Sequence, residues 1–529
     1  MTATDLEHEI RSGRLSAEHL QRSRRGQFVV VTWQELVGTT TAGPASGMTA
    51  IYHTRLTDSR EHLISSSARL LAGAVDAAPD AEALALQLLD FMPHPVNHTA
   101  MWSGVECVEP GNILTKGSRG NYSTRRWWHP PSPTRTLHDA REDVRRELIA
   151  AVELRTGMGP NFAADLSGGL DSTPICHLAG RSGRQFVART VASRDAADQD
   201  MEWAAKAASS IPGLVHLKIP AENVPLYYSE LDAPVAPTDE PATTLLEAGR
   251  QFVGLKEVSS NAETLLTGVG GDHLFTPPFA LLRTALQTQP APALKRIRQA
   301  SLQNGWRLRD VLASARPIDY PTWIDRCKNT LDRRPSLGAH ALDWDSPPHL
   351  PAWATSNARD AVISALEAAS RHATPLSQDR GQHADQYMIH HGTRIARVLN
   401  EGAFFHHAIR FEHPYFDDRL IESCMQIRPL ERSDPWNFKP VIKSAMQGII
   451  HPAMQLRQDK GAGSVDKYAG LANNRQRISD QIENSLLAEM GLIDVSRLKS
   501  EIDGAPQIAV LTEQLDATLA TEKWLRTAL

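Results

Sequence analysis

Two kinds of hydrophobic periodicity alternate in the middle of the chain. Short apolar runs predict β-strands at residues 162–165, 186–191 and 215–219, and the segments that begin at residues 172 and 200 have the spacing of helices. Strands that alternate with helices in this way predict a parallel sheet covered by helices. Because ligands of such a sheet bind at the carboxyl ends of its strands, we expect a functional site at that edge.

The pattern changes on both sides of this α/β region. Upstream, short β-type segments separated by turns, with one helical stretch among them, indicate a smaller α+β unit that ends at the proline-rich residues 130–133. Beyond residue 275 the pattern becomes mainly helical. We therefore predict an N-terminal domain at residues 1–134 and a second domain at residues 135–529, with a helical insertion around residues 280–356.

Composition narrows the class of protein. A chain of 529 residues is too long for one hydrophobic core, and its formal net charge of -5 argues against a general nucleic-acid binder, which usually carries a strongly basic face. The four cysteines are widely separated and form no CxxC pair, so neither a disulfide framework nor a zinc ribbon is expected. The sequence has no signal-peptide pattern and no long uninterrupted apolar run. We expect a cytoplasmic protein with no nucleic-acid and no membrane partner.

The first candidate for chemistry is a glycine-rich turn that joins the strand at residues 162–165 to the following helix. It reads Asp-Leu-Ser-Gly-Gly-Leu-Asp-Ser, and it brings backbone N–H groups and two serine hydroxyls to the positive end of a helix dipole. Paired glycines let the backbone approach an anion closely, and Asp171 can hold a divalent cation that bridges phosphate oxygens. The Gly-Lys-Ser/Thr ending of a Walker loop is absent. The predicted phosphate-binding residues are Ser167, Gly168, Gly169, Leu170, Asp171 and Ser172.

A second apolar strand ends in a similar way. Residues 265–272 read Leu-Leu-Thr-Gly-Val-Gly-Gly-Asp, so bare backbone and one carboxylate reach the same edge of the sheet. Asp272 can face Asp171 there across a shared cation. Since magnesium prefers oxygen ligands and keeps phosphate oxygens in its coordination shell, we predict that these two aspartates hold Mg²⁺ against a triphosphate.

Both motifs resemble signatures of the asparagine synthetase superfamily, whose members cleave ATP to AMP and pyrophosphate. The first is similar to the pyrophosphate loop of that superfamily and the second to its next signature. Segments at residues 411–418, 438–443 and 456–463 are similar to further family segments. The resemblance implies an α/β protein in which a glutaminase-like domain of the N-terminal nucleophile type, with an α+β fold, precedes a synthetase domain. That second domain would have a doubly wound parallel sheet and a helical C-terminal part.

The resemblance also implies roles for individual residues, with ATP and Mg²⁺ as the expected cofactors. Lys460 matches a lysine that neutralises charge on the acyl-adenylate and on the tetrahedral intermediate, a task that suits a flexible ammonium group. Lys439 is a second catalytic candidate, and Glu240 is the candidate general base because its segment resembles one that faces the nucleotide and the acceptor. The residues expected to seat the adenylate are Thr267, Gly268, Gly270 and Asp272.

Departures from the family pattern make some reactions of the family less expected for this chain. Val269 stands where asparagine synthetases carry Glu and β-lactam synthetases carry Tyr, and valine can neither accept a proton from ammonia nor join a Tyr-Glu relay. Glutamine-dependent asparagine synthetases begin with a nucleophilic Cys, whereas this sequence begins Met1-Thr2 and has its first cysteine at Cys107. We therefore expect a degenerate glutaminase-like domain and an amine that already belongs to the substrate.

Two groups of the superfamily are similar to this description, the β-lactam synthetases and the lasso-peptide macrolactam synthetases, and the second fits better. The resemblance implies an ATP-dependent lasso cyclase that adenylates an Asp or Glu side chain of a precursor peptide and closes a macrolactam with the N-terminal amine. Its expected partners are the precursor peptide and the leader-binding and leader-peptidase proteins of the same pathway. The alternatives are a small-molecule amide synthetase of the β-lactam or asparagine type, a non-catalytic scaffold, and a thread-guiding role without adenylation.

Overall fold

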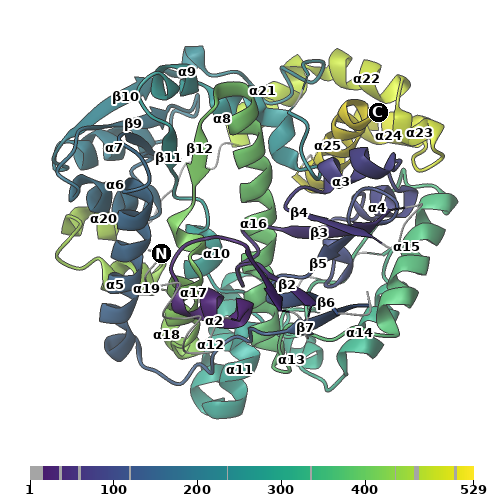
Figure 1. The fold of residues 1–529 in the computed structure, drawn as a ribbon, viewed down its shortest axis with the longest axis horizontal. Helices are drawn as coiled ribbons and strands as arrows, with labels where there is room; N and C mark the ends of the chain where they lie inside the picture. Colours follow the sequence, from purple (N-terminus) through teal and green to yellow (C-terminus); the bar gives the residue numbers. More distant parts are fainter. Residues whose placement is uncertain are drawn as a thin grey trace.

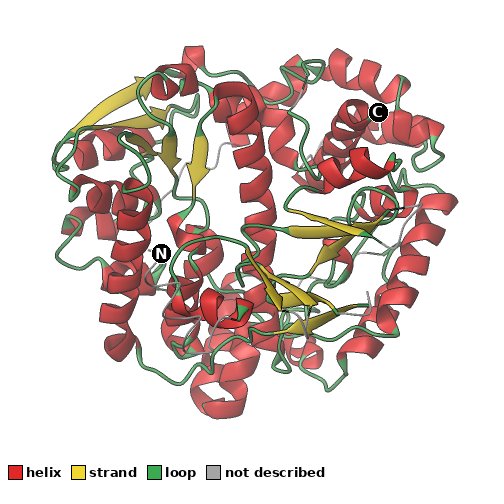
Figure 2. Cartoon of the chain, in the orientation of Figure 1, coloured by secondary structure: helices red, strands yellow, loops and turns green. Residues whose placement is uncertain are grey.

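A long central helix divides the strands of the protein into two groups. The computed structural model describes residues 16–34, 38–56, 61–117, 121–234, 236–333, 336, 338–434, 436–457, 464–504 and 509–529. In Figure 1 helix α16 (Arg380–His407) runs between the N-terminal strands on one side and the strands of the middle region on the other. Figure 2 shows that helices surround both groups. The predicted mixed α/β fold class is confirmed.

The N-terminal region contains two antiparallel sheets with strand orders β1-β2-β6-β7 and β4-β3-β5. Three pairs of strands that are consecutive along the chain, β1 with β2, β3 with β4 and β6 with β7, pair antiparallel, as the turn-rich pattern of the sequence predicts. The strands are β1 (Val30–Gln34), β2 (Gly38–Ala42), β3 (Ile51–Arg55), β4 (His62–Ser65), β5 (Val105–Val108), β6 (Asn112–Lys116) and β7 (Tyr122–Arg126). The helices of this region are α2 (Ala17–Ser23), α3 (Ala68–Val75) and α4 (Ala81–Leu86).

The middle region forms the parallel sheet that the sequence predicts. Its strands lie in the order β10-β9-β8-β11-β12, and every pairing between them is parallel. They are β8 (Phe162–Asp165), β9 (Phe186–Val191), β10 (Leu214–Ile219), β11 (Thr264–Leu266) and β12 (Arg410–Glu412). The chain builds outward from β8 to one side and later to the other, which confirms the doubly wound topology. The point where the two directions separate lies between β8 and β11, where ligands of such sheets bind.

Strands β8 and β11 are almost wholly apolar because a central parallel strand is covered by helices on both faces. Phe162 and Leu265 are buried, as are their neighbours along the two strands. The residue that caps the N-terminus of helix α5 (Leu137–Thr156) is Thr136, whose side chain accepts a hydrogen bond from the backbone N–H of Asp139. The other helices beside the sheet are α6 (Ser172–Gly180), α7 (Asp200–Ala208), α8 (Ala248–Phe252), α9 (Leu255–Ser259) and α10 (Gly271–Phe275).

The region around residues 280–356 is helical only in part. Its helices are α11 (Leu281–Thr288), α12 (Pro290–Gln303), α13 (Leu308–Ser314) and α14 (Tyr320–Cys327), and α15 (Ser356–Ser370) follows. The described residues between 328 and 355 form turns and loops instead of a helix. The proline- and glycine-rich sequence of this stretch accounts for the difference, since both residue types interrupt helices.

The C-terminal part is helical, as predicted. After α16 come α17 (Asp418–Met425), α18 (Pro429–Arg432), α19 (Pro440–Ala445), α20 (Pro452–Leu456), α21 (Ser464–Asn473), α22 (Arg475–Glu483), α23 (Leu486–Glu489), α24 (Val495–Gly504) and α25 (Ala509–Ala528). Across the part of the chain that the structure describes, no helix combines the length and the apolar character needed to cross a membrane.

The N-terminal region and the rest of the chain share hydrophobic cores. Trp102 lies edge-on to Trp524 with ring centroids 5.1 Å apart, and the Nε1–H of Trp128 donates to Glu422 at 2.6 Å. On α16, the hydroxyl of Thr393 donates to the backbone carbonyl of Ser46 at 2.9 Å. These contacts show that the seam, the contact between the N-terminal region and the rest of the chain, is packed like a protein interior. The boundary between residues 134 and 135 stays a prediction.

Candidate active site

The loop after β8 folds back on the first residue of α6, and its role as an anion site stays a prediction. The backbone N–H of Ser167 donates to the Ser172 hydroxyl at 2.9 Å, and the two serine hydroxyls lie 3.0 Å apart, so the loop closes on the first residue of α6. Gly168 has a φ of +70°, and a Cβ there would lie 2.4 Å from the backbone nitrogen of Ala204. Only glycine fits this position. The side chain of Leu170 packs into a core, which leaves its backbone to face a ligand.

The loop after β11 lies directly against the first loop. A Cβ on Gly268 would lie 2.9 Å from the carbonyl carbon of Asp171, and one on Gly271 would lie 2.2 Å from the Asp171 carboxylate oxygen Oδ1. Gly270 has a φ of +99°, the left-handed backbone conformation that favours glycine. The glycines of the second motif therefore serve to let two loops meet, and Asp272 follows at the start of α10.

Lys439 joins the two predicted metal-binding carboxylates. Its ammonium group forms an ion pair with Oδ1 of Asp171 and another, at 2.6 Å, with Oδ1 of Asp272. The lysine is buried with 3% exposure, whereas the Asp272 side chain is 57% exposed, so the cluster is open on the Asp272 side. The backbone of Lys439 has a φ of +51° at the N-terminus of α19, which turns its side chain into the site. The structure thus brings together three of the residues that the sequence singled out.

The donor chemistry of this cluster fits a magnesium ion. Two carboxylates converge on one ammonium group and therefore lie close enough together to share one cation. No group of three or more metal-ligating side chains occurs among the residues that were described. Phosphate oxygens of a bound nucleotide would complete the shell, as is usual for Mg²⁺. Asp171 and Asp272 would hold the ion.

Three residues that sequence reasoning did not select also support the phosphate loop. Arg457 forms an ion pair with Asp200, and its Nη1 donates to the backbone carbonyl of Ser167 at 3.4 Å. The hydroxyl of Tyr415 donates to the backbone carbonyl of Asp171 at 2.7 Å. Arg457 and Tyr415 belong to segments that were matched to the family, and that is the signal that could have identified them. Lys460 lies outside the described residues, so its catalytic role stays a prediction.

Thr267, which is predicted to seat the adenylate, uses its hydroxyl within the protein. That hydroxyl lies 2.7 Å from Nδ1 of His413 and accepts from the backbone N–H of Val269 at 3.2 Å, so it is engaged within the protein. Burial lowers the pKa of His413 to about 3, and the nearby Arg155 acts in the same direction. A neutral histidine therefore anchors the second loop, and the backbone of Thr267 stays as the part that can face a nucleotide.

Glu240 lies in a buried ion-pair cluster. Its carboxylate oxygens pair with Arg394 and Arg397, each at 2.7 Å. Burial raises the pKa of Glu240, but the two guanidinium groups outweigh this effect and hold the pKa below its usual value. A carboxylate with a lowered pKa is a weak proton acceptor. The geometry favours a role in holding α16 in place, and the general-base role predicted from the sequence stays untested.

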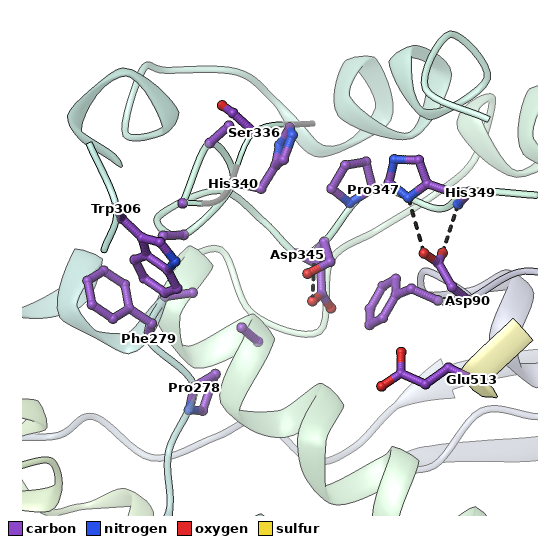
Figure 3. Close-up of a pocket in the computed structure, with 17 residues that line it drawn as sticks. Asp90, Pro278, Phe279, Trp306, Ser336, His340, Asp345, Pro347, His349 and Glu513 are labelled. Carbon is purple, nitrogen blue, oxygen red and sulfur yellow. Dashed lines mark hydrogen bonds and ion pairs between the residues drawn. The ribbon is translucent and has the colours of Figure 1, made fainter. Parts of the chain in front are cut away.

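One cavity lies beside this cluster, and a second cavity adjoins the first. The first has a volume of about 380 Å³ and is lined by Glu240, His391 and Arg394 among others. The ring of His391 lies 6.2 Å from that of His273, the residue after Asp272, so this cavity reaches the α10 side of the nucleotide loops. The second cavity, shown in Figure 3, has a volume of about 490 Å³ and shares Asp90, Phe91 and Glu513 with the first. Space for a substrate therefore continues away from the loops.

Comparison with known proteins places this geometry in a family. A search of the curated proteins gave no match. The family model described as Asparagine synthase matches residues 143–526, which include both glycine loops, Lys439 and the parallel sheet. The chain therefore belongs to the asparagine synthase family, whose members are ATP-dependent amide-forming synthetases.

Proposed function

We propose that this ATP-dependent synthetase is a macrolactam synthetase of the lasso-cyclase type. It would activate an Asp or Glu side chain of a precursor peptide and join it to the N-terminal amine of the same peptide. The observation that carries the proposal is a pair of adjoining cavities with volumes of about 380 and 490 Å³, the first of which reaches the α10 side of the nucleotide loops. That is room for several residues of a peptide, in the range of pockets that hold drug-sized ligands.

The nucleotide loops suit the first half of this reaction. The loop at residues 167–172 would hold the triphosphate of ATP, and Lys439 would neutralise negative charge beside it. A carboxylate oxygen of the peptide would attack the α-phosphorus, and the bond from that phosphorus to the pyrophosphate would break. Mg²⁺ bound to Asp171 and Asp272 would supply further charge neutralisation on the phosphate oxygens. The products of this step are an acyl-adenylate and pyrophosphate.

The second half forms the amide. The N-terminal amine of the peptide would attack the activated carbonyl carbon, the bond from that carbon to the AMP oxygen would break, and the amine proton would pass to a base. Glu240 is the sequence-based candidate for that base, and Lys460 the candidate for stabilising the tetrahedral intermediate. The acyl-adenylate must be kept from water until the ring closes, which a deep cavity favours.

Val269 supports this reaction over the related small-molecule chemistries. It packs against two hydrophobic clusters and offers no proton-transfer group beside the loops. The Glu of asparagine synthetases and the Tyr of β-lactam synthetases, which resemble this chain elsewhere, have no counterpart there. A small-molecule amide synthetase remains the second candidate, and the predicted leader-binding and leader-peptidase partners belong to the first candidate alone.

The test is an incubation of the full chain with Mg²⁺-ATP and a leader-free precursor peptide encoded beside its gene. AMP release and peptide mass are followed together. We expect peptide-dependent AMP and a product lighter by one water. AMP formed with aspartate and ammonia but not with peptide would move the assignment to the small-molecule synthetases. A Lys460→Ala variant that still closes the ring would contradict the adenylation mechanism and favour thread guidance.

A further inference from the structure

The larger cavity lies away from the nucleotide loops, under the turns that follow α14. Figure 3 shows Trp306 and Phe279 together on one wall, with ring centroids 5.1 Å apart and the rings edge to face. Phe91, from the N-terminal region, contributes a third aromatic side chain. The cavity volume of about 490 Å³ leaves room for a long side chain beside these aromatic rings.

The Asp345 carboxyl group in this cavity has no charged partner among the described residues. Oδ1 of Asp345 accepts only from the backbone N–H of Ser346, at 2.9 Å, and the buried Oδ2 has no hydrogen-bond partner in the described structure. Its neighbour Asp343 differs, because Arg380 lies 3.5 Å and His340 3.8 Å from the Asp343 carboxylate. Figure 3 places the Asp345 side chain in the middle of the cavity view.

The surroundings of Asp345 are acidic and aromatic. The described lining residues include Asp90 and Glu513 but no lysine or arginine, and Asp90 is paired with His349 at 3.3 Å. Burial, together with the charge of Asp343, raises the pKa of Asp345 well above its usual value. A buried carboxyl without a partner is costly, and a cation brought to it would both remove that cost and interact with the aromatic faces.

We propose that this cavity binds a lysine or arginine side chain of the substrate, with Asp345 as its counter-ion and Trp306 and Phe279 as aromatic walls. The inference deepens the proposed function, on which it rests for the identity of the substrate as a peptide. The cavity adjoins the one beside the nucleotide loops through Asp90, Phe91 and Glu513. A peptide anchored here by a basic residue would extend from the anchor toward the site of amide formation.

Binding can be tested without any turnover. The full chain is titrated with agmatine, which carries a guanidinium group on a short chain, and with the uncharged N-butylacetamide, while tryptophan fluorescence is followed. We expect agmatine to bind and N-butylacetamide to bind at least about tenfold more weakly, since hydrogen bonds to charged groups contribute most. Trp306→Phe should remove most of the signal, and Asp345→Asn should weaken agmatine by at least about tenfold.

The matched control is Asp332→Asn, which changes an exposed aspartate whose partner is Arg359 on the surface. It should leave agmatine affinity unchanged. Failure of agmatine to bind, or equal binding to the wild type and to Asp345→Asn, would overturn the inference. Equal binding of the uncharged probe would do the same.

Turnover then separates the inference from the proposed function. With a peptide that the enzyme cyclises, replacing its basic residue by norleucine should raise KM about tenfold in the wild type and leave KM unchanged in Asp345→Asn. If agmatine binds through Asp345 but no peptide releases AMP, the proposed function fails and the cation site stands. If peptides are cyclised but neither Asp345→Asn nor the norleucine peptide changes KM, the cation site fails and the function stands.

Discussion

Two regions of the molecule hold buried cations against carboxylates, and they differ in access to solvent. At the nucleotide loops, Lys439 bridges Asp171 and an Asp272 side chain that is 57% exposed. Along α16, Arg394 and Arg397 enclose Glu240, whose side chain is only 12% exposed. A cluster that is open on one side can exchange its internal partner for a ligand, whereas a closed cluster keeps its partner and contributes to stability. We therefore expect the open cluster to take part in ligand binding and the closed cluster to contribute to stability.

The strongest test of the open cluster is Lys439→Met. Removing the ammonium leaves two carboxylates facing each other and takes away the positive charge beside the triphosphate. We expect peptide-dependent AMP formation to fall by about 10²–10³-fold, the usual effect of losing one charge-stabilising group. The measurement is steady-state AMP release under saturating Mg²⁺-ATP.

The matched control for that variant is Lys443→Met, one turn further along α19. Lys443 donates to Asn437 at 3.3 Å near the surface and makes no ion pair with Asp171 or Asp272 in the described residues. It should retain activity. Comparable losses in the two variants would show that α19, and not the charge of Lys439, is what the reaction needs.

A second test concerns the shape of the first loop. Gly168→Ala would place a Cβ 2.4 Å from the backbone nitrogen of Ala204 in addition to the left-handed backbone strain. We expect AMP formation to fall by about 10²-fold, because a small displacement of a positioning loop is enough for that loss. The rate is measured per folded molecule after thermal unfolding has been recorded.

Gly183→Ala is the control that separates the effect of the close contact with Ala204 from the effect of left-handed backbone strain. Gly183 has the same φ of +70°, but a Cβ there meets nothing within 4 Å. It should cost about 1–2 kcal/mol of stability through backbone strain alone and leave the rate unchanged. If Gly168→Ala and Gly183→Ala changed the rate equally, the close approach between Gly168 and Ala204 would not matter for the reaction.

The open region is also the one that local sequence patterns describe well. The strand, glycine turn and helix at residues 162–180 follow from contiguous residues, so spacing alone predicts the loop. The same holds for Gly270 and Asp272 after β11. Strand β12 was not predicted, because its sequence Arg-Phe-Glu has one apolar residue between two charged ones and lacks the apolar run that marks β11. Lys439 was selected only through family resemblance, since nothing in its own segment points to Asp171.

The closed region and the larger cavity could not be predicted in this way. In the closed region, Arg394 and Arg397 reach Glu240 from 154 and 157 positions away. Asp345 sits in a stretch without regular structure, opposite side chains from the N-terminal region and from the C-terminal helix. Contacts of this kind depend on tertiary packing, which a single sequence does not encode in any local pattern. Composition gave no sign of the cavity.

For the closed cluster, Glu240→Gln separates an architectural role from proton transfer. Losing the carboxylate leaves Arg394 and Arg397 buried without their counter-ion, so we expect a loss of about 3 kcal/mol in the free energy of unfolding. Ring closure per folded molecule should change less than about twofold if the ion pair is purely architectural. Denaturant unfolding and single-turnover mass spectrometry provide the two measurements. A selective slowing of ring closure, with pyrophosphate release unchanged, would instead establish Glu240 as the general base.

The last prediction, whose effect per pH unit is small, concerns a second buried acid, Glu401, close to the closed cluster. Glu401 on α16 accepts a hydrogen bond from the backbone N–H of Asp239 at 3.0 Å, and Asp239 in turn accepts from Ser67 of the N-terminal region at 2.7 Å. Burial, together with the charge of Asp239, raises the pKa of Glu401 to about 8. The raised value means that the folded protein holds a proton that the unfolded chain releases at lower pH. The contribution of the Glu401 proton to the free energy of unfolding is therefore complete below the unfolded pKa of 4.5. It is lost as the pH rises through about 8.

We expect the free energy of unfolding to fall by roughly 1 kcal/mol per pH unit between about pH 5 and pH 8 from this group, and Glu401→Gln to flatten that slope. Glu367→Gln, at an exposed partner of Lys328, should leave the slope as it is in the wild type. Urea unfolding at a series of pH values measures both. A slope that persists in Glu401→Gln would assign the proton to Asp239, because burial also raises the pKa of that carboxyl. The contact between the N-terminal region and α16 would then loosen with rising pH through Asp239.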